Sequence, residues 1–175
     1  MQNPFTIWLT GLPSSGKTTL AEALHNLLKG KGMPSVMLDG DSFRRAVSAD
    51  LGFSLNDRQE NVRRVANVAK IINKSGVVVI CSFISPTEQI REMAKKLVGE
   101  NCFFEVYVNT PLGVCKERDT KGMYKKAEEG IIKSFTGIDS PYEPPISPDL
   151  IINTARKSSN QCAKTIFNSI SQKFF

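Results

Sequence analysis

Two patterns of apolar and polar positions alternate along the chain. Apolar runs of strand length lie at residues 5–10, 36–38, 77–83, 103–109 and 150–152. Apolar residues recur every three or four positions, as in helices, at residues 17–28, 56–75, 87–97 and 160–170, and a short helix is expected from Pro111. Strands that alternate with helices predict an α/β fold with a three-layer, doubly wound parallel sheet. The long second helix is expected to begin at Asn56, with Gln59 completing a capping box.

Residues 119–148 interrupt this alternation. The stretch is first rich in charge and then in glycine and proline, and it has little strand signal. A segment of about thirty such residues inside a compact domain is more often a functional lid than an inert connection. We therefore predict one domain over residues 1–175 with a lid near residues 119–148; a solvated surface excursion is the alternative.

Length and charge narrow the function classes. The longest apolar run, at residues 77–84, is far shorter than the roughly 20 residues of a membrane span, and residues 5–9 already form a strand where a secretory leader would lie. The net charge of +6 suits an anionic partner. Because the basic excess is local, between Arg44 and Lys70, we expect a small phosphate compound as partner, no nucleic acid and no membrane.

The cysteines and the histidine argue against a zinc centre. Cys81, Cys102, Cys115 and Cys162 form no CxxC pair and no cluster with the single histidine, His25. Free thiols in a reducing cytoplasm are the expected state, and His25 lies in a predicted helix, where a structural role is favoured.

The sharpest motif is a phosphate loop between the first strand and the first helix. Residues 11–18, GLPSSGKT, match GxxxxGK[ST] in full. Backbone N–H groups of such a loop surround phosphate oxygens, its lysine reaches the β- and γ-phosphates, and its threonine hydroxyl ligates Mg²⁺. We therefore predict that the chain binds a nucleoside triphosphate. The candidate residues are Gly11, Leu12, Pro13, Ser14, Ser15, Gly16, Lys17, Thr18 and Thr19.

Two carboxylates follow the second strand directly. Asp39 and Asp41 lie where ligands of parallel sheets bind, beyond the carboxyl ends of the strands. They are candidates for holding Mg²⁺ or for taking a proton from an attacking hydroxyl, whereas a turn with Asp39 as helix cap is the alternative. The third strand ends without an acidic residue, so the metal and base roles are expected to fall on this pair.

A second group of candidates binds an anion or a base. Arg58 and Asn61 are three residues apart and share a helix face, so both are expected to point at one ligand. A guanidinium grips phosphate or sulfate bidentately, and Arg44 is a further candidate. Phe53 and Phe135 lie in polar, loop-like surroundings, where they either stack on a nucleobase or pack in the core.

Eight sequence blocks together resemble the adenylylsulfate (APS) kinase family, from near the N-terminus to about Leu150. In chain order they are GLPSSGKTT (11–19), LDGD (38–41), DLGFS (50–54), DRQENVRR (57–64), SFISP (82–86), NTPL (109–112), RDTKGMYKKA (118–127) and FTGIDSPYE (135–143). The phosphate loop alone is generic, but the blocks in this order are highly specific.

The resemblance implies a phosphoryl transfer from MgATP to the 3′-hydroxyl of APS, which gives 3′-phosphoadenosine 5′-phosphosulfate (PAPS) and ADP in sulfate assimilation. It implies that Asp41 orients or deprotonates this hydroxyl, that Arg44, Arg58 and Asn61 hold the phosphosulfate end, and that Phe53 and Phe135 sandwich the adenine. It further assigns Arg118 to ATP, Ile84 and Lys121 to the substrate site, and Lys125 and Lys126 to the lid. Ser85 falls on a recorded phosphoserine position, although a contact to substrate explains that block equally well. A stand-alone kinase, often a homodimer in this family, is the expectation.

Two places in the chain, residues 87–88 and residue 128, depart from the family pattern. Thr87 and Glu88 stand where an aromatic residue or histidine and then arginine are usual, and Glu128 stands where arginine is common. These changes bear on substrate affinity more than on reaction type. The alternatives are another small-molecule kinase, a GTPase switch and a nucleic-acid-dependent ATPase. The chain has no NKxD motif for guanine and no long basic surface for nucleic acid.

Overall fold

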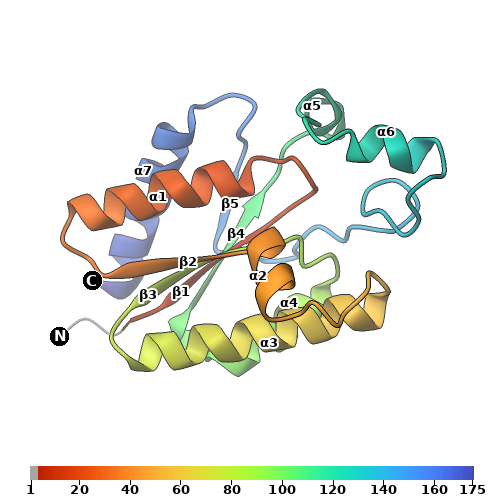
Figure 1. The fold of residues 1–175 in the computed structure, drawn as a ribbon. Coiled ribbons are helices and arrows are strands. Elements are labelled where there is room, and N and C mark those ends of the chain that lie inside the picture. Colours follow the sequence, from red (N-terminus) through yellow and green to blue (C-terminus); the bar gives the residue numbers. More distant parts are fainter. Residues whose placement is uncertain (1–3) are drawn as a thin grey trace.

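The computed structural model describes residues 4–175 as one parallel sheet with helices on both faces (Figure 1). Residues 1–3, which the predicted domain includes, lie outside the described residues. The strands are β1 (Thr6–Thr10), β2 (Ser35–Asp39), β3 (Val78–Ser82), β4 (Phe103–Val108) and β5 (Leu150–Ile152). The helices are α1 (Lys17–Gly30), α2 (Gly40–Ala46), α3 (Leu55–Lys74), α4 (Glu88–Val98), α5 (Leu112–Glu117), α6 (Met123–Glu128) and α7 (Ser159–Phe174), and a 3₁₀ turn, η1 (Glu100–Cys102), precedes β4.

The sheet has the order β2-β3-β1-β4-β5, and every neighbouring pair is parallel. The predicted doubly wound α/β sheet is therefore confirmed. After β1 the chain builds two strands on one side of it and then two on the other, so the strand order reverses beside β1. The carboxyl ends of all five strands lie at one edge, and ligands of such sheets bind at this reversal.

Two apolar cores hold the layers together. On one face of the sheet Ile7 and Leu9 pack with α1 and α7, and on the other Trp8 packs with α3, α4 and Phe43 of α2. The alternation of Ile7, Trp8 and Leu9 between the two cores follows from the two-residue period of a strand. Both faces are buried, which explains why the strands are continuous apolar runs.

The structure differs from the sequence-based elements at three places. The N-cap of helix α3 lies two residues earlier than expected, because Ser54 and not Asn56 is the cap and forms a capping box with Asp57. The segments that hold α2 and α6 had no helical prediction, since both helices are short and lack an apolar period. None of the helices among residues 4–175 is long and apolar enough to cross a membrane.

Candidate functional site

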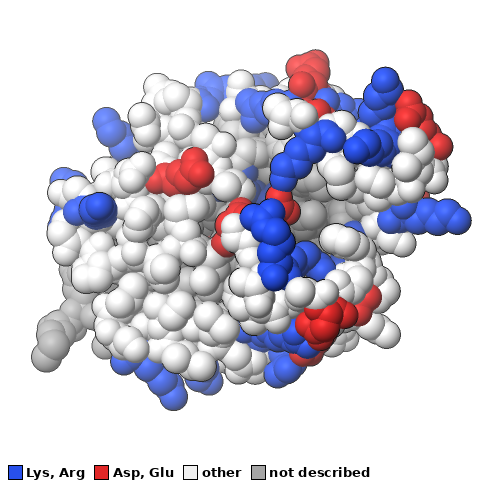
Figure 2. Space-filling view, in the orientation of Figure 1, with Lys and Arg blue, Asp and Glu red and all other residues white. Residues whose placement is uncertain are grey.

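The candidate site lies at the carboxyl ends of the strands, between α2 and α3 on one side and the lid on the other (Figure 1). The loops that leave β1, β2 and β3 carry the phosphate loop, the two aspartates and Ser85. Lysine and arginine side chains gather around a hollow on this face (Figure 2). The sheet therefore brings together residues that are far apart in sequence, and the surrounding charge favours an anionic ligand.

The phosphate loop has the backbone shape that its glycines allow. Gly11 has φ +154°, and a Cβ at this position would lie 2.6 Å from the carbonyl oxygen of Val108. Gly16 has φ +92° and is the N-cap of α1, so the loop runs into the helix through a left-handed residue. Only glycine adopts these conformations without strain, and helix α1 directs its first N–H groups at the loop.

Lys17 is buried beneath the phosphate loop. Its ammonium donates hydrogen bonds to the carbonyl oxygens of Gly11 (3.0 Å) and Leu12 (2.7 Å) and lies 3.3 Å from the hydroxyl of Ser15. Burial lowers the pKa of Lys17 from 10.5 to about 8, although Cys115, Asp39 and Asp41 oppose the shift. The ammonium of Lys17 is thus placed to bind phosphate, but only part of it is protonated in mildly alkaline solution.

This pKa predicts that ATP binding takes up a proton. At pH 8.5 most of Lys17 is neutral in the free protein, and bound phosphates stabilise its cation, so binding should take up about 0.8 of a proton at pH 8.5 and about 0.1 at pH 7. Calorimetric titration with ATP in two buffers of different ionisation enthalpy measures this uptake.

The matched control for this titration is Lys17→Arg, which stays charged at both pH values and should show no uptake. A wild-type binding enthalpy that does not depend on the buffer at pH 8.5 would contradict the assignment of the titrating group to Lys17.

Asp39 joins the phosphate loop to the second strand. The hydroxyl of Thr18 donates to its carboxylate (2.9 Å), and the same carboxylate accepts the backbone N–H groups of Asp41 and Ser42 as the N-cap of α2. The predicted alternative of Asp39 as a helix cap is therefore confirmed, and it coexists with the contact to Thr18. Asp41, exposed in the first turn of α2, forms an ion pair with Lys121 of the lid.

The donor set at this point fits Mg²⁺. A hydroxyl and carboxylates are hard oxygen ligands, and Mg²⁺ in kinases takes one or two carboxylates together with substrate phosphates. Among residues 4–175 no three His, Cys, Asp or Glu side chains cluster as a metal site. At this point Thr18, Asp39 and Asp41 are the residues that would hold Mg²⁺ together with the phosphates of a nucleotide.

The predicted anion-binding residues cluster beside α3. Arg58 is buried, and its guanidinium donates to the carbonyl oxygens of Phe53 and Ser134 and to the hydroxyl of Thr136. Arg44 donates to the carbonyl of Gly52, and its guanidinium lies 4.6 Å from the ring centre of Phe53. Phe53 is 60% exposed, so a nucleobase can reach it, and burial lowers the pKa of both arginines below its ordinary value.

Asn61 carries a second sign of a ligand site. Its side chain is 4% exposed, and its Oδ1 has no hydrogen-bond partner among the described residues. Buried polar atoms are nearly always paired, so this orphaned oxygen one helical turn after Arg58 leaves an acceptor available to a donor group of a ligand. By contrast Arg63 and Arg64 pair with Glu60 and Asp50, which braces the loop before α3.

The lid is held against the phosphate loop by aromatic residues. The hydroxyl of Tyr124 donates to the carbonyl of Pro13, and the rings of Tyr124 and Phe135 meet edge to face at 4.9 Å. Asp139 accepts the backbone N–H groups of Ser134 and Phe135 and so fixes the turn before Phe135; these hydrogen bonds hold the pKa of its carboxyl below 3.8. Sequence reasoning missed Tyr124 as a link between the lid and the loop, although it lies in a quoted block.

Ser85 follows β3 in a strained conformation and is 2% exposed. Its hydroxyl oxygen accepts the indole N–H of Trp8 at 2.9 Å. The carbonyl of the preceding residue, Ile84, accepts the hydroxyl of Thr10 at 2.7 Å. Both residues are thus fixed from below by the first strand.

Arg118 lies at the other end of the phosphate loop. It donates to the hydroxyl and the carbonyl of Thr154, the loop residue after β5. The hydroxyls of Thr154 and Thr110 both donate to the carbonyl of Ser15. Thr110 lies in the quoted block NTPL (109–112), where no role was predicted for it, whereas Thr154 is a lone polar residue after a strand and lies outside every quoted block.

The two departures from the family pattern pair with cations of this chain. Glu128 forms an ion pair with Lys116 of α5, and Glu88 forms one with Arg91 of α4. Lys125 and Lys126 are exposed on α6. The four cysteines are free thiols, as predicted.

The comparisons with known proteins agree with each other. A family model described as adenylylsulphate kinase matches residues 3–153. An adenylyl-sulfate kinase of Prochlorococcus marinus is 50% identical over 164 residues, which cover 94% of this chain and 82% of that protein. A probable adenylyl-sulfate kinase of Bacillus subtilis is 48% identical over 167 residues, or 95% of this chain and 84% of that protein.

Solved structures show the same similarity. The Mycobacterium tuberculosis APS kinase in complex with AMPPNP and APS has a TM-score of 0.94 and 40% identity, with 98% of this chain and 99% of that chain covered. A gluconokinase from Sinorhizobium meliloti has a TM-score of 0.63 at 14% identity, with 98% of this chain and 94% of that chain covered, and therefore shares the fold alone.

Proposed function

The chain belongs to the adenylylsulphate kinase family, and on this premise we propose that it transfers the γ-phosphoryl group of MgATP to the 3′-hydroxyl of APS, giving PAPS and ADP. The observation that carries the proposal is the contact of Thr18 with Asp39, which puts the end of the phosphate loop and Asp41 at the same strand edge. Donor phosphates and acceptor hydroxyl then meet between them.

Lys17 and the loop amides hold the donor phosphates. As ATP binds, the lysine exchanges its contacts with Gly11 and Leu12 for phosphate oxygens, which stabilise its cationic form. Arg118, held beside Gly16 by Thr154, is placed to contact the nucleotide. Thr18, Asp39 and Asp41 would hold Mg²⁺, which would supply charge neutralisation on the phosphates when bound.

The acceptor lies between α3 and the lid. Asp41 orients the 3′-hydroxyl and takes its proton, Arg44 and Arg58 neutralise the phosphosulfate, and Asn61 donates a side-chain amide N–H to it. Phe53 and Phe135 stack on the adenine. Lys121 and the rest of the lid exclude the water that would otherwise hydrolyse ATP.

We infer that Ser85 and Ile84 act through their position and not through a phosphoserine. The burial of Ser85 and its bond to Trp8 support this choice. Ser85→Ala should lower kcat by no more than about tenfold and lower the free energy of unfolding by about 1–3 kcal/mol, because the indole N–H loses its acceptor. Activity assays and thermal unfolding measure the two effects. Complete loss of turnover in a folded variant would favour the covalent route.

Incubation with MgATP and APS, followed by chromatography of the products, tests the proposed function. Gluconate, shikimate, AMP and CMP serve as parallel acceptors. PAPS should form from APS, and none of the other four acceptors should be phosphorylated. Phosphorylation of one of them in place of APS would show that the chain is a different small-molecule kinase.

Three further features belong to the proposal. We propose one kinase domain with residues 119–148 as its lid, a cytoplasmic setting, which the free thiols support, and no nucleic acid as partner.

A homodimer stays a prediction. A solved relative from Thiobacillus denitrificans, 30% identical with a TM-score of 0.74, is described as hexameric, and this chain covers 29% of it. Sedimentation of the purified protein measures the assembly.

A further inference from the structure

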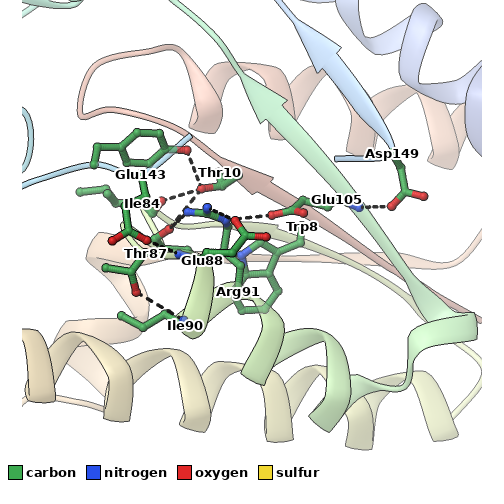
Figure 3. A network of polar contacts seen from close by, with 12 residues as sticks. Trp8, Thr10, Ile84, Thr87, Glu88, Ile90, Arg91, Glu105, Glu143 and Asp149 are labelled. Atoms are coloured by element: carbon green, nitrogen blue, oxygen red, sulfur yellow. Dashed lines mark hydrogen bonds and ion pairs between the residues drawn. The ribbon is translucent and has the colours of Figure 1, made fainter. Parts of the chain in front are cut away.

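A buried arginine lies directly beneath the substrate side of the site. Arg91, in the first turn of α4, is 2% exposed. Its guanidinium donates to the carbonyl of Ser85 (2.8 Å) and to the carboxylate of Glu88 (2.5 Å), and its Nε lies 3.2 Å from the carboxylate of Glu105 on β4. Figure 3 shows Arg91 between the two glutamates.

Such a cluster adds little to stability compared with apolar packing. Taking one guanidinium and two carboxylates out of water costs several kcal/mol per ion, which their attraction repays only in part. The cluster is asymmetric as well, since Arg91 Nε and Glu105 Oε1 meet as an ion pair without hydrogen-bond geometry. Stability alone therefore does not explain a buried arginine at this position, and the groups that its guanidinium contacts offer another explanation.

Arg91 holds the peptide of Ser85. Ser85 has φ +46°, which is unfavourable for a residue with a Cβ and persists only when its surroundings fix it. The carbonyl contact from Arg91 and the indole contact from Trp8 provide this restraint. The loop after β3 therefore has its shape set from the protein interior.

The same cluster reaches the end of the lid. Glu143 accepts the backbone N–H of Glu88 and donates its own N–H to the carbonyl of Pro86. The ring of Tyr142 lies 5.8 Å from the Arg91 guanidinium, and its hydroxyl contacts that of Thr10. Tyr142 and the Ser85 loop thus contact Arg91 itself, and Glu143 is bonded to the backbone of Pro86 and Glu88 beside it.

We propose that Arg91, held between Glu88 and Glu105, is a positioning residue that sets the Ser85 loop and the exit of the lid for the binding of APS. This inference rests on the proposed function. It also gives Glu88 a role, because an arginine at position 88 would put a second cation where Arg91 now finds an anion.

Glu105 makes the arrangement dependent on pH. Burial raises the pKa of Glu105 to about 7, although Arg91 and Lys95 lower it while Glu88 and Asp149 raise it. Below this pH Glu105 is neutral and Arg91 keeps one carboxylate in place of two. The positioning role therefore predicts that APS binds more tightly as the pH rises from 6 to 8.

Stability follows the opposite course. The folded pKa of Glu105 lies above its ordinary value, so the folded protein binds more protons between about pH 4.5 and 7, and its contribution to stability is lost as the pH rises through this range. A merely structural cluster would make the protein less stable towards pH 8 without tightening APS binding, so the two roles are separable.

The experiment compares wild type, Glu105→Gln and Arg91→Lys, with Glu92→Gln, exposed on α4, as the control. KM for APS, KM for ATP and kcat are measured from pH 6 to 8, and unfolding is followed for each variant. Trp8 is the only tryptophan and contacts Ser85, so its fluorescence reports APS binding at equilibrium.

For wild type and Glu92→Gln, KM for APS should fall roughly three- to tenfold from pH 6 to 8. For Glu105→Gln, KM for APS should stay from pH 6 to 8 at the high value that wild type has at pH 6, with KM for ATP unchanged. Arg91→Lys should raise KM for APS at every pH. A Glu105→Gln profile that follows wild type within twofold would overturn the inference while leaving the function intact. A wild type that forms no PAPS would overturn the proposed function and this inference together.

Discussion

Replacing Lys17 by alanine is expected to lower kcat by about 10²–10³ and to leave the fold intact. Lys17 is the buried cation of the phosphate loop, and its ammonium is the group that meets charge developing on the transferred phosphoryl. Removing the desolvated charge raises the free energy of unfolding of the variant, whereas losing the hydrogen bonds to Gly11 and Leu12 lowers it. The two effects therefore oppose each other. Single-turnover assays with ATP and APS measure the loss.

Lys29→Ala, an exposed lysine in the last turn of α1, is the matched control and should behave as wild type. Thermal unfolding with and without ATP separates the causes. ATP should raise the Tm of wild type and of the control much more than that of Lys17→Ala. Turnover at the wild-type rate in a folded Lys17→Ala protein would remove this lysine from the mechanism.

The sheet could be predicted because its signal is local. Strands β1 and β3 are short apolar runs that are buried on both faces, and such runs are recognised without knowledge of the neighbouring strands. Every predicted strand end lies within one residue of the observed end. Helix α3 was predicted with a cap two residues late, because Asp57 completes the capping box in place of the usual Glu or Gln.

What the sequence did not reveal is contact between distant segments. Trp8 was read as a strand residue, and nothing local indicates that its indole meets Ser85, 77 residues later. Thr154 is an isolated polar residue until the fold brings it against Arg118. Glu88 was interpreted as a lost positive charge, whereas in the structure its carboxylate forms an ion pair with the buried Arg91. Such pairings depend on strand order, which the periodicity of single elements does not encode.

Asp41→Asn should lower kcat by about 10²–10⁴ and change KM for ATP much less, because Thr18, Asp39 and the nucleotide would still hold Mg²⁺. The amide keeps the size of the side chain, and Asp39 still caps α2, so the helix remains in place. What is lost is the charge that orients the acceptor hydroxyl and the oxygen that takes its proton. PAPS formation at saturating ATP and APS measures kcat, and Glu92→Gln again serves as the carboxylate control.

The ion pair of Asp41 with Lys121 offers a second explanation for such a loss, namely that the aspartate only holds the lid. A double-mutant cycle separates the two roles. If Asp41 acts on the substrate, Asp41→Asn should cost far more than Lys121→Ala, and the double variant should retain the full loss of Asp41→Asn. If it acts through the lid, both single variants and the double variant should lose activity equally, and a kcat of Asp41→Asn within threefold of wild type would exclude both roles.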